Sequence, residues 1–578
     1  MPPPVRRTQL PRQALRPSNP RPTETTCPRQ FSYKHPRQFL VAHAGSSRPQ
    51  LPFLYPTGQH LSSGQIARLF SISANHKKFI KETAKLSVRY SILIFIVSSC
   101  VSIAGMGILS EQQERAFPSP HEWSLITRFR FRRGKWWMVP ENNEEEGFPN
   151  WARVYDELDH ALSRLEDPST DGAGVAEQEE GGILVPGVGK AGLDITAKSE
   201  EWRQGYFEVL IGMAAAAERL DGWVTDKWRR NVWAPEFVES KSNPRPKAVL
   251  PGMPEVPDEN NRVAASDNPE TFYLKIITTK GFTTRQRVTA ALGYADWLSF
   301  KKLPDSAEEM YRWALDIAAS GLSTPDTSAV IDRKTAVLSA TAPKEHVTPN
   351  IVYAATNLAT FYAEQGRLAA SLPILVSLLR ARLSAEDAPS PASKAQDSSL
   401  LGTVLSLLKE PDYPAVPSSG DEPLLRHETD RCEEAVLKNY IGEILFATAG
   451  SAEQRQQGLS WVREGVSTSK TAQSLEPISH NDELRKKCEK CEEVGLESWG
   501  KIMTYMAAEA RNKHTSATSG GLTGLLWKIR GTQKLEEDLE NLEGEEEGVV
   551  MRLNKLRSKM LRDEYAELDR KYARTFVF

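Results

Sequence analysis

The most extended apolar run in the chain covers Tyr90 to Ser110 and contains no charged side chain. Basic residues such as Lys85 and Arg89 precede it, and Glu111 follows it. About 20 apolar residues suffice for a helix to cross a bilayer, and this run lacks the polar face that a soluble helix normally keeps. The run therefore predicts a transmembrane helix over residues 90–110 instead of a buried core helix. A cleaved secretory signal is a weaker alternative, because such a signal would usually lie within about the first 15 to 30 residues, and this run begins only at Tyr90.

Beyond residue 110, apolar residues recur at intervals of three and four, which is typical of amphipathic helices. The pattern is clear from Trp151 to Leu165 and from Trp202 to Leu220. Strand-like alternation of comparable length is absent from this part of the sequence, so we expect an all-α fold. Three intervening segments, at residues 166–198, 235–269 and 386–431, are polar or rich in Gly, Pro and Ser and predict mobile insertions.

Three helical pairs follow the spacing of tetratricopeptide (TPR) repeats, in which two antiparallel helices approach closely through small residues. The predicted structural positions of the two clearest copies are Tyr294, Ala295, Ala307, Tyr311 and Ala314, and then Leu358, Ala359, Tyr362, Gly366, Ser371 and Leu375. A weaker third copy aligns Gly442 with Gly458 and Val462, and a helix over residues 484–511 would close the array. The overall expectation is a single transmembrane helix followed by a divergent TPR-like helical-hairpin solenoid.

The carboxyl-terminal region repeats apolar residues every seven positions, at Leu535, Leu542, Val549 and Leu556. Such heptads permit a coiled coil over residues 535–560, although Gly544 would weaken it. A helix that caps the last repeat uses the same apolar stripe, and we favour this cap.

Charge is distributed unevenly along the chain. Residues 1–110 contain 15 Lys and Arg against Glu24 and Glu82, whereas the remainder has a formal net charge of −15. An Arg-rich, acid-poor leader is typical of mitochondrial transit segments, the alternative being a disordered basic tail. The acidic remainder argues against nucleic-acid binding, which requires clustered cations. The basic flank also predicts that the amino terminus stays in the matrix and that the carboxyl-terminal domain lies in the intermembrane space.

A segment dense in aromatic and basic residues follows the predicted span, from Pro118 to Met138. Tryptophan and arginine together favour the headgroup region of a membrane. The segment is expected either to lie along the bilayer surface or to pack beneath the first helices of the domain.

Motifs that would indicate catalysis are incomplete. The stretch Pro186–Lys190 resembles a phosphate-binding loop, but Leu184 stands at the leading glycine position and Ala191 at the hydroxyl position. No nucleophile elbow or dinucleotide fingerprint occurs in the sequence. We therefore expect a protein that is not an enzyme, with no cofactor, no metal and no small-molecule substrate.

The cysteines leave several possibilities open. Cys488 and Cys491 form a CxxC motif that, with Cys432 and His427, makes a nominal zinc ligand set. Both cysteines of the motif fall within a helical pattern, where they usually serve as small core residues. The three cysteines could be free, joined in a disulfide or bound to metal.

These features divide the chain into regions as follows: targeting segment 1–75, basic matrix-side flank 76–89, transmembrane helix 90–110, juxtamembrane segment 111–150, helical pair with flexible insertion 151–234, Pro-rich linker 235–269, TPR-like repeats with insertions 270–515, and carboxyl-terminal helical cap or coiled coil 516–578.

In this layout the chain resembles the fungal TPR-containing adaptor subunit of the mitochondrial i-AAA protease. The resemblance rests on the order of the basic leader, the single span, the segment Pro118–Trp123 with its following arginines, and the divergent repeats through about residue 509. It implies an inner-membrane adaptor that binds non-native client proteins and assists their delivery to the protease. The rival expectation is a membrane-tethered scaffold or assembly factor for a respiratory or ribosomal complex.

In such an adaptor, first-helix side chains of the repeats would form the protein-binding groove. The candidates are Asp296, Tyr353, Thr356, Asn357 and Thr360, whose mixed polarity suits permissive binding. A clamp for chaperone carboxylates would require basic residues in this groove. Because its matching positions hold residues such as Leu292 and Tyr440 in place of cations, capture of chaperone tails is not expected.

Overall fold

The computed structural model describes residues 73–143, 148–178, 183–185, 189–229, 231–249, 251–324, 326–389, 413–518 and 525–575. The chain forms two compact units, residues 1–101 and 102–578. In the first unit the described part belongs to α2 (Ala74–Ala116), which continues into the second. This helix is long and apolar enough to cross a membrane, and its most apolar stretch is not buried against the described protein. It includes the predicted span and the predicted basic flank.

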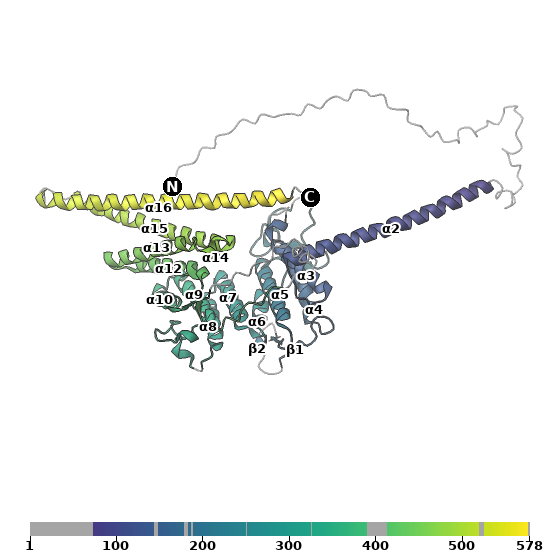
Figure 1. The fold of residues 1–578 in the computed structure, drawn as a ribbon, viewed down its shortest axis with the longest axis horizontal. Helices are drawn as coiled ribbons and strands as arrows, with labels where there is room; N and C mark the ends of the chain where they lie inside the picture. Colours follow the sequence, from purple (N-terminus) through teal and green to yellow (C-terminus); the bar gives the residue numbers. More distant parts are fainter. Residues whose placement is uncertain are drawn as a thin grey trace, which may run out of the picture. The chain divides into compact units, whose positions relative to one another are not determined.

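The second unit is mostly helical, as expected (Figure 1). Its helices are α3 (Leu125–Met138), α4 (Trp151–Glu166), α5 (Glu200–Arg219), α6 (Pro269–Thr278), α7 (Thr284–Phe300), α8 (Pro304–Ser320), α9 (Pro349–Glu364), α10 (Leu368–Ser384), α12 (Arg431–Thr448), α13 (Ala452–Ala472), α14 (Glu476–Ser479), α15 (Asp482–Thr518) and α16 (Leu525–Thr575). From α3 to α10 each helix packs against the next α-helix in the chain.

Short strands and 3-10 helices occur in the connections. β1 (Ala176–Glu177) pairs with β4 (Leu193–Asp194), β2 (Ile183–Val185) with β3 (Gly189–Ala191), β5 (Val224–Asp226) with both β6 (Val232–Trp233) and β7 (Arg262–Ala264), and β8 (Glu386–Asp387) with β9 (Leu425–Arg426). The 3-10 turns are η2 (Pro140–Asn142), η3 (Pro235–Phe237), η4 (Glu259–Asn261), η5 (Thr327–Ala329), η6 (Lys344–His346) and η7 (Glu428–Asp430). The phosphate-loop-like stretch lies partly outside the described residues, and its described part belongs to β3.

The predicted positions of the two clearest repeats lie where the helices of each pair meet. α8 begins at Pro304, whose fixed φ and missing N–H suit a first helical turn. Gly366 turns the chain between α9 and α10 at a φ of +73°, which glycine adopts without strain. Across that pair, Ser371 Oγ donates to the Ala359 carbonyl at 2.7 Å. The other positions, Ala295, Ala307, Tyr311, Ala314, Leu358, Tyr362 and Leu375, are buried, and Tyr294 is half-buried against the same core.

The helices of the third pair, α12 and α13, pack against each other at glycine positions. A Cβ on Gly442 would meet Val462 Cγ2 at 2.6 Å and the Gly458 carbonyl oxygen at 2.7 Å. A Cβ on Gly458 would in turn meet the Phe446 backbone nitrogen at 2.7 Å. These separations are shorter than van der Waals contact, so the two backbones approach as closely as they do because neither position carries a side chain.

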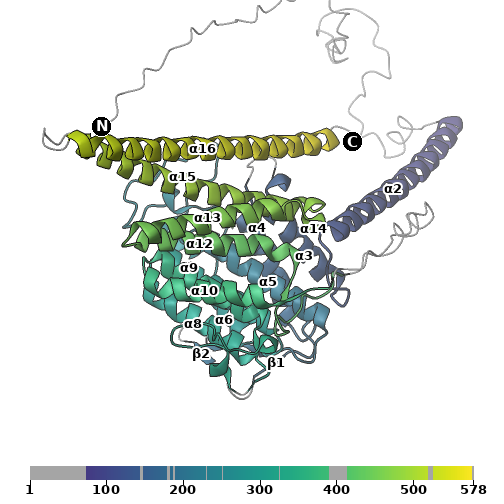
Figure 2. The ribbon, with the colours of Figure 1, turned by 60° about the vertical axis from the view of Figure 1, so that its left-hand side comes forward.

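The carboxyl-terminal helix α16 lies along α15 in the antiparallel direction (Figures 1 and 2). Arg511 pairs with Glu543 at 2.7 Å, and nearer the start of α15 Glu493 pairs with Arg557 at 2.7 Å. Val549 and Leu556 of the heptad stripe are buried with residues of α13 and α15, and Leu542 packs nearby. The side chain of Leu535 lies outside the described residues. Within one chain α16 therefore covers the preceding helices as the expected cap would.

The described ends of two predicted insertions, residues 166–198 and 386–431, contact the helices of the second unit. Asp421 accepts hydrogen bonds from Thr284 Oγ1 at 2.8 Å and Asn350 Nδ2 at 2.9 Å, joining the returning chain to α7 and α9. Gly420 lies so close to Asn350 that a Cβ at this position would overlap the Asn350 Oδ1 atom. Likewise, Ile195 in the first insertion is fully buried in the main core. Composition favoured loops at these places, but side-chain caps and short strands hold their backbone groups.

Candidate protein-binding site

The predicted groove residues lie on two helices that touch each other. Tyr353, Thr356, Asn357 and Thr360 recur at three- and four-residue intervals along α9 and are half-buried. Tyr353 also contacts α7, because the Arg285 guanidinium lies 4.0 Å from the centre of its ring. The α9 residues therefore form one continuous stripe, beside the helix that carries Asp296.

Most polar groups of this stripe are already engaged by their own helix. Thr356 Oγ1 donates to the Val352 carbonyl at 2.6 Å and Thr360 Oγ1 to the Thr356 carbonyl at 3.0 Å. Asn357 Nδ2 donates to the Tyr353 carbonyl at 2.8 Å. Hydroxyls and amides satisfied in this way offer acceptor oxygens and apolar surface to a partner and leave few free donors.

The carboxylate of Asp296 in α7 binds a side chain of the neighbouring helix α8. Tyr311 of α8 donates its hydroxyl hydrogen to the Asp296 carboxylate. Part of the residue is exposed, but its carboxyl group is turned towards Tyr311, which is 5% exposed. Desolvation raises the pKa of Asp296, and the hydrogen bond from Tyr311 opposes this shift. The structure thus gives Asp296 a role in packing α7 against α8.

A second concave surface was missed from sequence. It lies between α8, α10 and the connection that follows α8, and has a volume of about 770 Å³. Its basic lining residues are Arg312, Lys334, Arg367 and Arg380, and its apolar part includes Val337, Leu338, Ala369, Ala370 and Pro373. We call this surface the cationic groove. Its four cations are far apart in sequence, so no local motif could have revealed it.

Two of these cations are neutralised by Glu308 of α8. Its carboxylate accepts from Arg367 at 2.5 Å, from Arg312 at 3.0 Å and from the Tyr362 hydroxyl at 3.0 Å. The hydrogen bond from Arg367 is the largest of the effects that lower the pKa of Glu308 to about 2. The network joins α8 to α9 and to the start of α10.

The other two cations remain available to a partner. Among the described residues, neither the Lys334 ammonium nor the Arg380 guanidinium has a hydrogen-bond or ion-pair partner. The connection that carries Lys334 is held in place by buried Val330, Ile331 and Leu338. The groove is also lined by the Asp332 carboxylate, which lies near Lys334, so its charged lining residues are four basic and one acidic. This excess of positive charge beside apolar surface suits an extended segment with acidic side chains.

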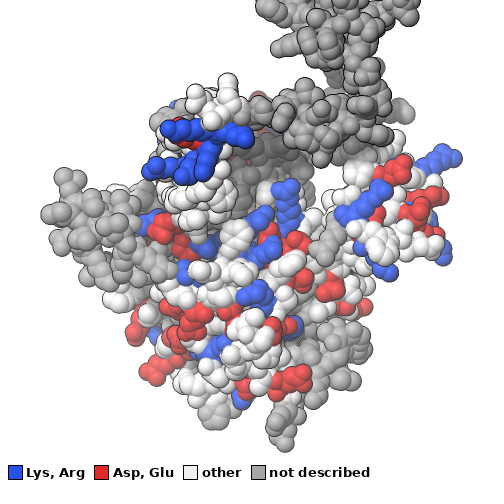
Figure 3. Space-filling view, turned by 90° about the vertical axis from the view of Figure 1, so that its right-hand side faces the viewer, with Lys and Arg blue, Asp and Glu red and all other residues white. Residues whose placement is uncertain are grey.

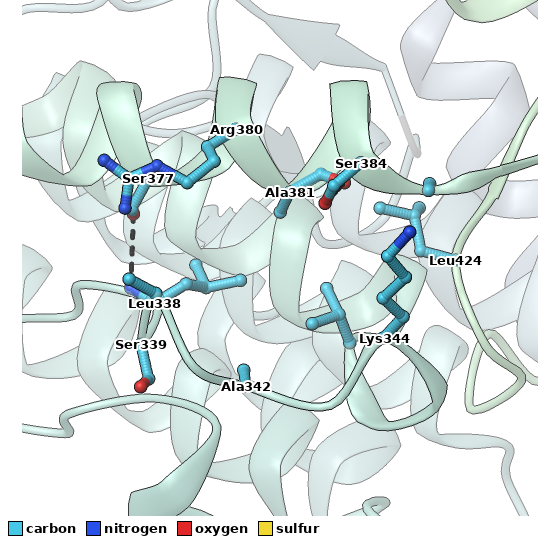
Figure 4. Close-up of a pocket in the computed structure, with 12 residues that line it drawn as sticks. Leu338, Ser339, Ala342, Lys344, Ser377, Arg380, Ala381, Ser384 and Leu424 are labelled. Atoms are coloured by element: carbon cyan, nitrogen blue, oxygen red, sulfur yellow. Dashed lines mark hydrogen bonds between the residues drawn. The ribbon is translucent and has the colours of Figure 1, made fainter.

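A smaller pocket of about 50 Å³ adjoins the cationic groove along α10 (Figure 4). Arg380 and Lys344 lie at its two sides, and Ser377 Oγ accepts a hydrogen bond from the Leu338 backbone N–H at 3.2 Å. This contact fixes the connection against α10. The pocket is too small for an organic ligand of ordinary size, for which sites measure about 300 Å³ or more.

Of the three cysteines in α12 and α15, two form a disulfide and one is a free thiol. Cys432 of α12 and Cys488 of α15 form a disulfide with a Cα–Cα distance of 5.3 Å. Burial is the main cause that raises the pKa of the free Cys491 thiol, which disfavours the reactive thiolate. Among the described residues, no group of three or more His, Cys, Asp or Glu side chains is placed to hold a metal ion.

On the face shown in Figure 3, one group of basic side chains lies at the upper left, and acidic and basic side chains are interspersed over the remaining coloured surface. No family model matches this chain, and neither the curated proteins nor the solved structures that were compared with it yield a match.

Proposed function

We propose that this chain is a membrane-anchored TPR-like adaptor that binds substrate proteins and assists their delivery to the mitochondrial i-AAA protease. The observation that carries the proposal is the combination of one apolar, unburied helix with a large body of paired helices. Helical pairs of this kind offer long surfaces for protein segments. Anchoring such a surface beside a membrane would raise the local concentration of clients near a membrane-bound protease.

Two surfaces are available for client binding under this proposal. The α9 stripe suits segments of mixed polarity, and the cationic groove suits acidic segments through Lys334 and Arg380. In the proposed topology, α2 crosses the inner membrane, the basic flank lies in the matrix and the chain beyond residue 110 lies in the intermembrane space. No small molecule, nucleic acid or cofactor is required for this role.

Co-isolation from mitochondria tests the function. If the proposal is right, the full-length chain will co-isolate with subunits of the i-AAA protease, and its deletion will stabilise substrates of that protease. Loss of a single respiratory or ribosomal complex, with protease substrates turned over normally, would instead indicate the assembly factor. Digestion of the second unit by added protease only after the outer membrane is opened would support the proposed topology.

A charge reversal tests the cationic groove. The double variant Lys334→Glu, Arg380→Glu should weaken crosslinking of acidic client segments, because the groove would then repel them. The double variant Lys241→Glu, Arg245→Glu, which makes the same change in charge, is the matched control, since both residues are exposed and lie outside the groove. Equal crosslinking by the double variant and the control would remove the groove from the binding surface.

A further inference from the structure

Helix α3, which follows α2, has one face buried and one face uncovered. Its buried face includes Phe131 and Gly134, and a Cβ on Gly134 would meet Leu158 Cδ2 of α4 at 2.6 Å. On the uncovered side, Leu125 is 76% exposed, Ile126 57% and Phe129 42%. Close packing against α4 therefore fixes which face of α3 points outward, and that face carries large apolar side chains.

A buried ion cluster attaches α3 to the end of α2. Glu114 is 3% exposed, and its carboxylate pairs with Arg132 at 2.5 Å and Arg128 at 3.2 Å. The backbone N–H and the hydroxyl of Ser119 each donate to Glu114 Oε1 at 2.8 Å. Every member of the cluster belongs to the second unit, so α3 and the last turns of α2 form one body.

One contact locates α3 relative to the apolar run. Arg132 Nη1 donates to the Ser110 carbonyl at 3.1 Å. Ser110 is the last residue of the uncharged run, so a helix that crosses the bilayer would place it at the edge of the hydrocarbon. Arg132 must then lie at the same depth, in the region where headgroups meet acyl chains. The residues of α3 that point outward are one or two turns away.

The residue types in α3 are those favoured in the headgroup region of a membrane. α3 carries five basic residues and no acidic ones, and two of its basic residues, Arg130 and Arg133, pair with Glu157 of α4. Arg133 also lies 5.5 Å from the centre of the Phe129 ring. Trp136 is half-buried near the end of α3, whereas Trp137 packs against the main core. Aromatic side chains combined with arginine are favoured at the interface between headgroups and hydrocarbon.

We propose that α3 is a second membrane contact, lying in the lipid interface with Leu125, Ile126 and Phe129 inserted at the boundary of the acyl chains. The occupant of this face is the bilayer itself. Two attachments, the span and α3, would restrict the tilt of the second unit relative to the membrane more than the span alone. The inference rests on the proposed spanning role of α2 and is independent of the client or protease.

Spin labels on the full-length chain test the proposal in nanodiscs of phosphatidylcholine and phosphatidylglycerol. The background replaces the other cysteines, Cys27, Cys100 and Cys491, with Ala and keeps the disulfide. Labels are placed singly through Leu125→Cys and Phe129→Cys. If α3 lies in the lipid, both labels will be relaxed more strongly by oxygen, which concentrates in lipid, than by a water-soluble nickel chelate.

Two further labels separate the possible outcomes. Phe300→Cys is the aqueous control, because Phe300 is 75% exposed at the end of α7, and Val97→Cys reports on the span. A lipid-like Val97 label with Leu125 and Phe129 labels that match Phe300 would overturn the α3 proposal and leave the span intact. Labels at 125 and 129 shielded from both reagents would indicate a protein partner and also overturn it. An aqueous Val97 label would refute the span and the proposal together.

Discussion

The close approach of α12 and α13 makes the sharpest prediction about the helical pairs. Replacing Gly442 with Ala would place a Cβ 2.6 Å from Val462 Cγ2 and 2.7 Å from the Gly458 carbonyl oxygen. The side chain of Val462 could rotate away, but the carbonyl belongs to the backbone of α13 and can retreat only if the two helices separate. Relief of the clash therefore requires loosening of the whole pair.

The size of the effect follows from two opposing terms. Alanine is favoured over glycine inside a helix by about 0.5–1 kcal/mol. Overpacking a close interface costs about 1–3 kcal/mol. Because the clash involves backbone, the upper half of that range applies, about 2–3 kcal/mol. After the helix-propensity gain is subtracted, Gly442→Ala should lower the free energy of unfolding by about 1–2.5 kcal/mol.

Gly500→Ala supplies the matched control. Gly500 lies in α15, and a Cβ there would meet only Val549 Cγ1 at 3.8 Å, an ordinary contact. Alanine at this position should therefore stabilise the chain by about 0.5–1 kcal/mol. The two variants make the same chemical change in a helix, but their effects on stability should have opposite signs.

Thermal unfolding of the full-length protein in detergent, followed by intrinsic fluorescence, measures both variants under one heating rate. Gly442→Ala should unfold at lower temperature than the parent protein and Gly500→Ala at the same or higher temperature. Hydrogen exchange should become faster in α12 and α13 for Gly442→Ala alone. If Gly442→Ala behaves like Gly500→Ala, the helices are not in contact at these glycines and the reasoning is refuted.

Three other perturbations test separate contacts. Glu114→Gln should speed hydrogen exchange in α3, since losing one partner of a buried ion pair costs about 3–5 kcal/mol; unchanged exchange would refute the cluster. Reducing the disulfide between Cys432 and Cys488, which are 56 residues apart, should remove about 4 kcal/mol by chain entropy. The readout is the melting temperature with and without reductant, and no shift would contradict the prediction. The pKa of Glu308 falls from 4.5 to about 2 in the folded chain. The ionised Glu308 should therefore contribute its full stabilisation of the folded state above a pH of about 4.5, and this contribution should be lost as the pH falls towards 2. Hydrogen exchange at the start of α10, measured as a function of pH, tests this. A Glu308→Gln variant should lack that pH dependence.

Sequence alone determined the features that depend on local chemistry. The apolar run within α2, the start of α8 at Pro304 and the turn at Gly366 each follow from a few neighbouring residues. The spacing of small and large side chains also predicted paired helices, whereas the TPR-like solenoid itself stays a prediction. The resulting expectation of helical pairs matches the described helices α7 to α10.

Tertiary structure decided which distant residues meet. Sequence left Cys432, Cys488 and Cys491 with several possible states, and only the packing of α12 on α15 brings the first two within disulfide distance. The cationic groove likewise forms because α8, α10 and the connection from α8 to α9 converge, and the ion cluster around Glu114 forms because α3 packs against the end of α2. Hydrophobic periodicity specifies which face of a helix is buried but not its partner, since burial is non-directional and many helices offer similar apolar faces.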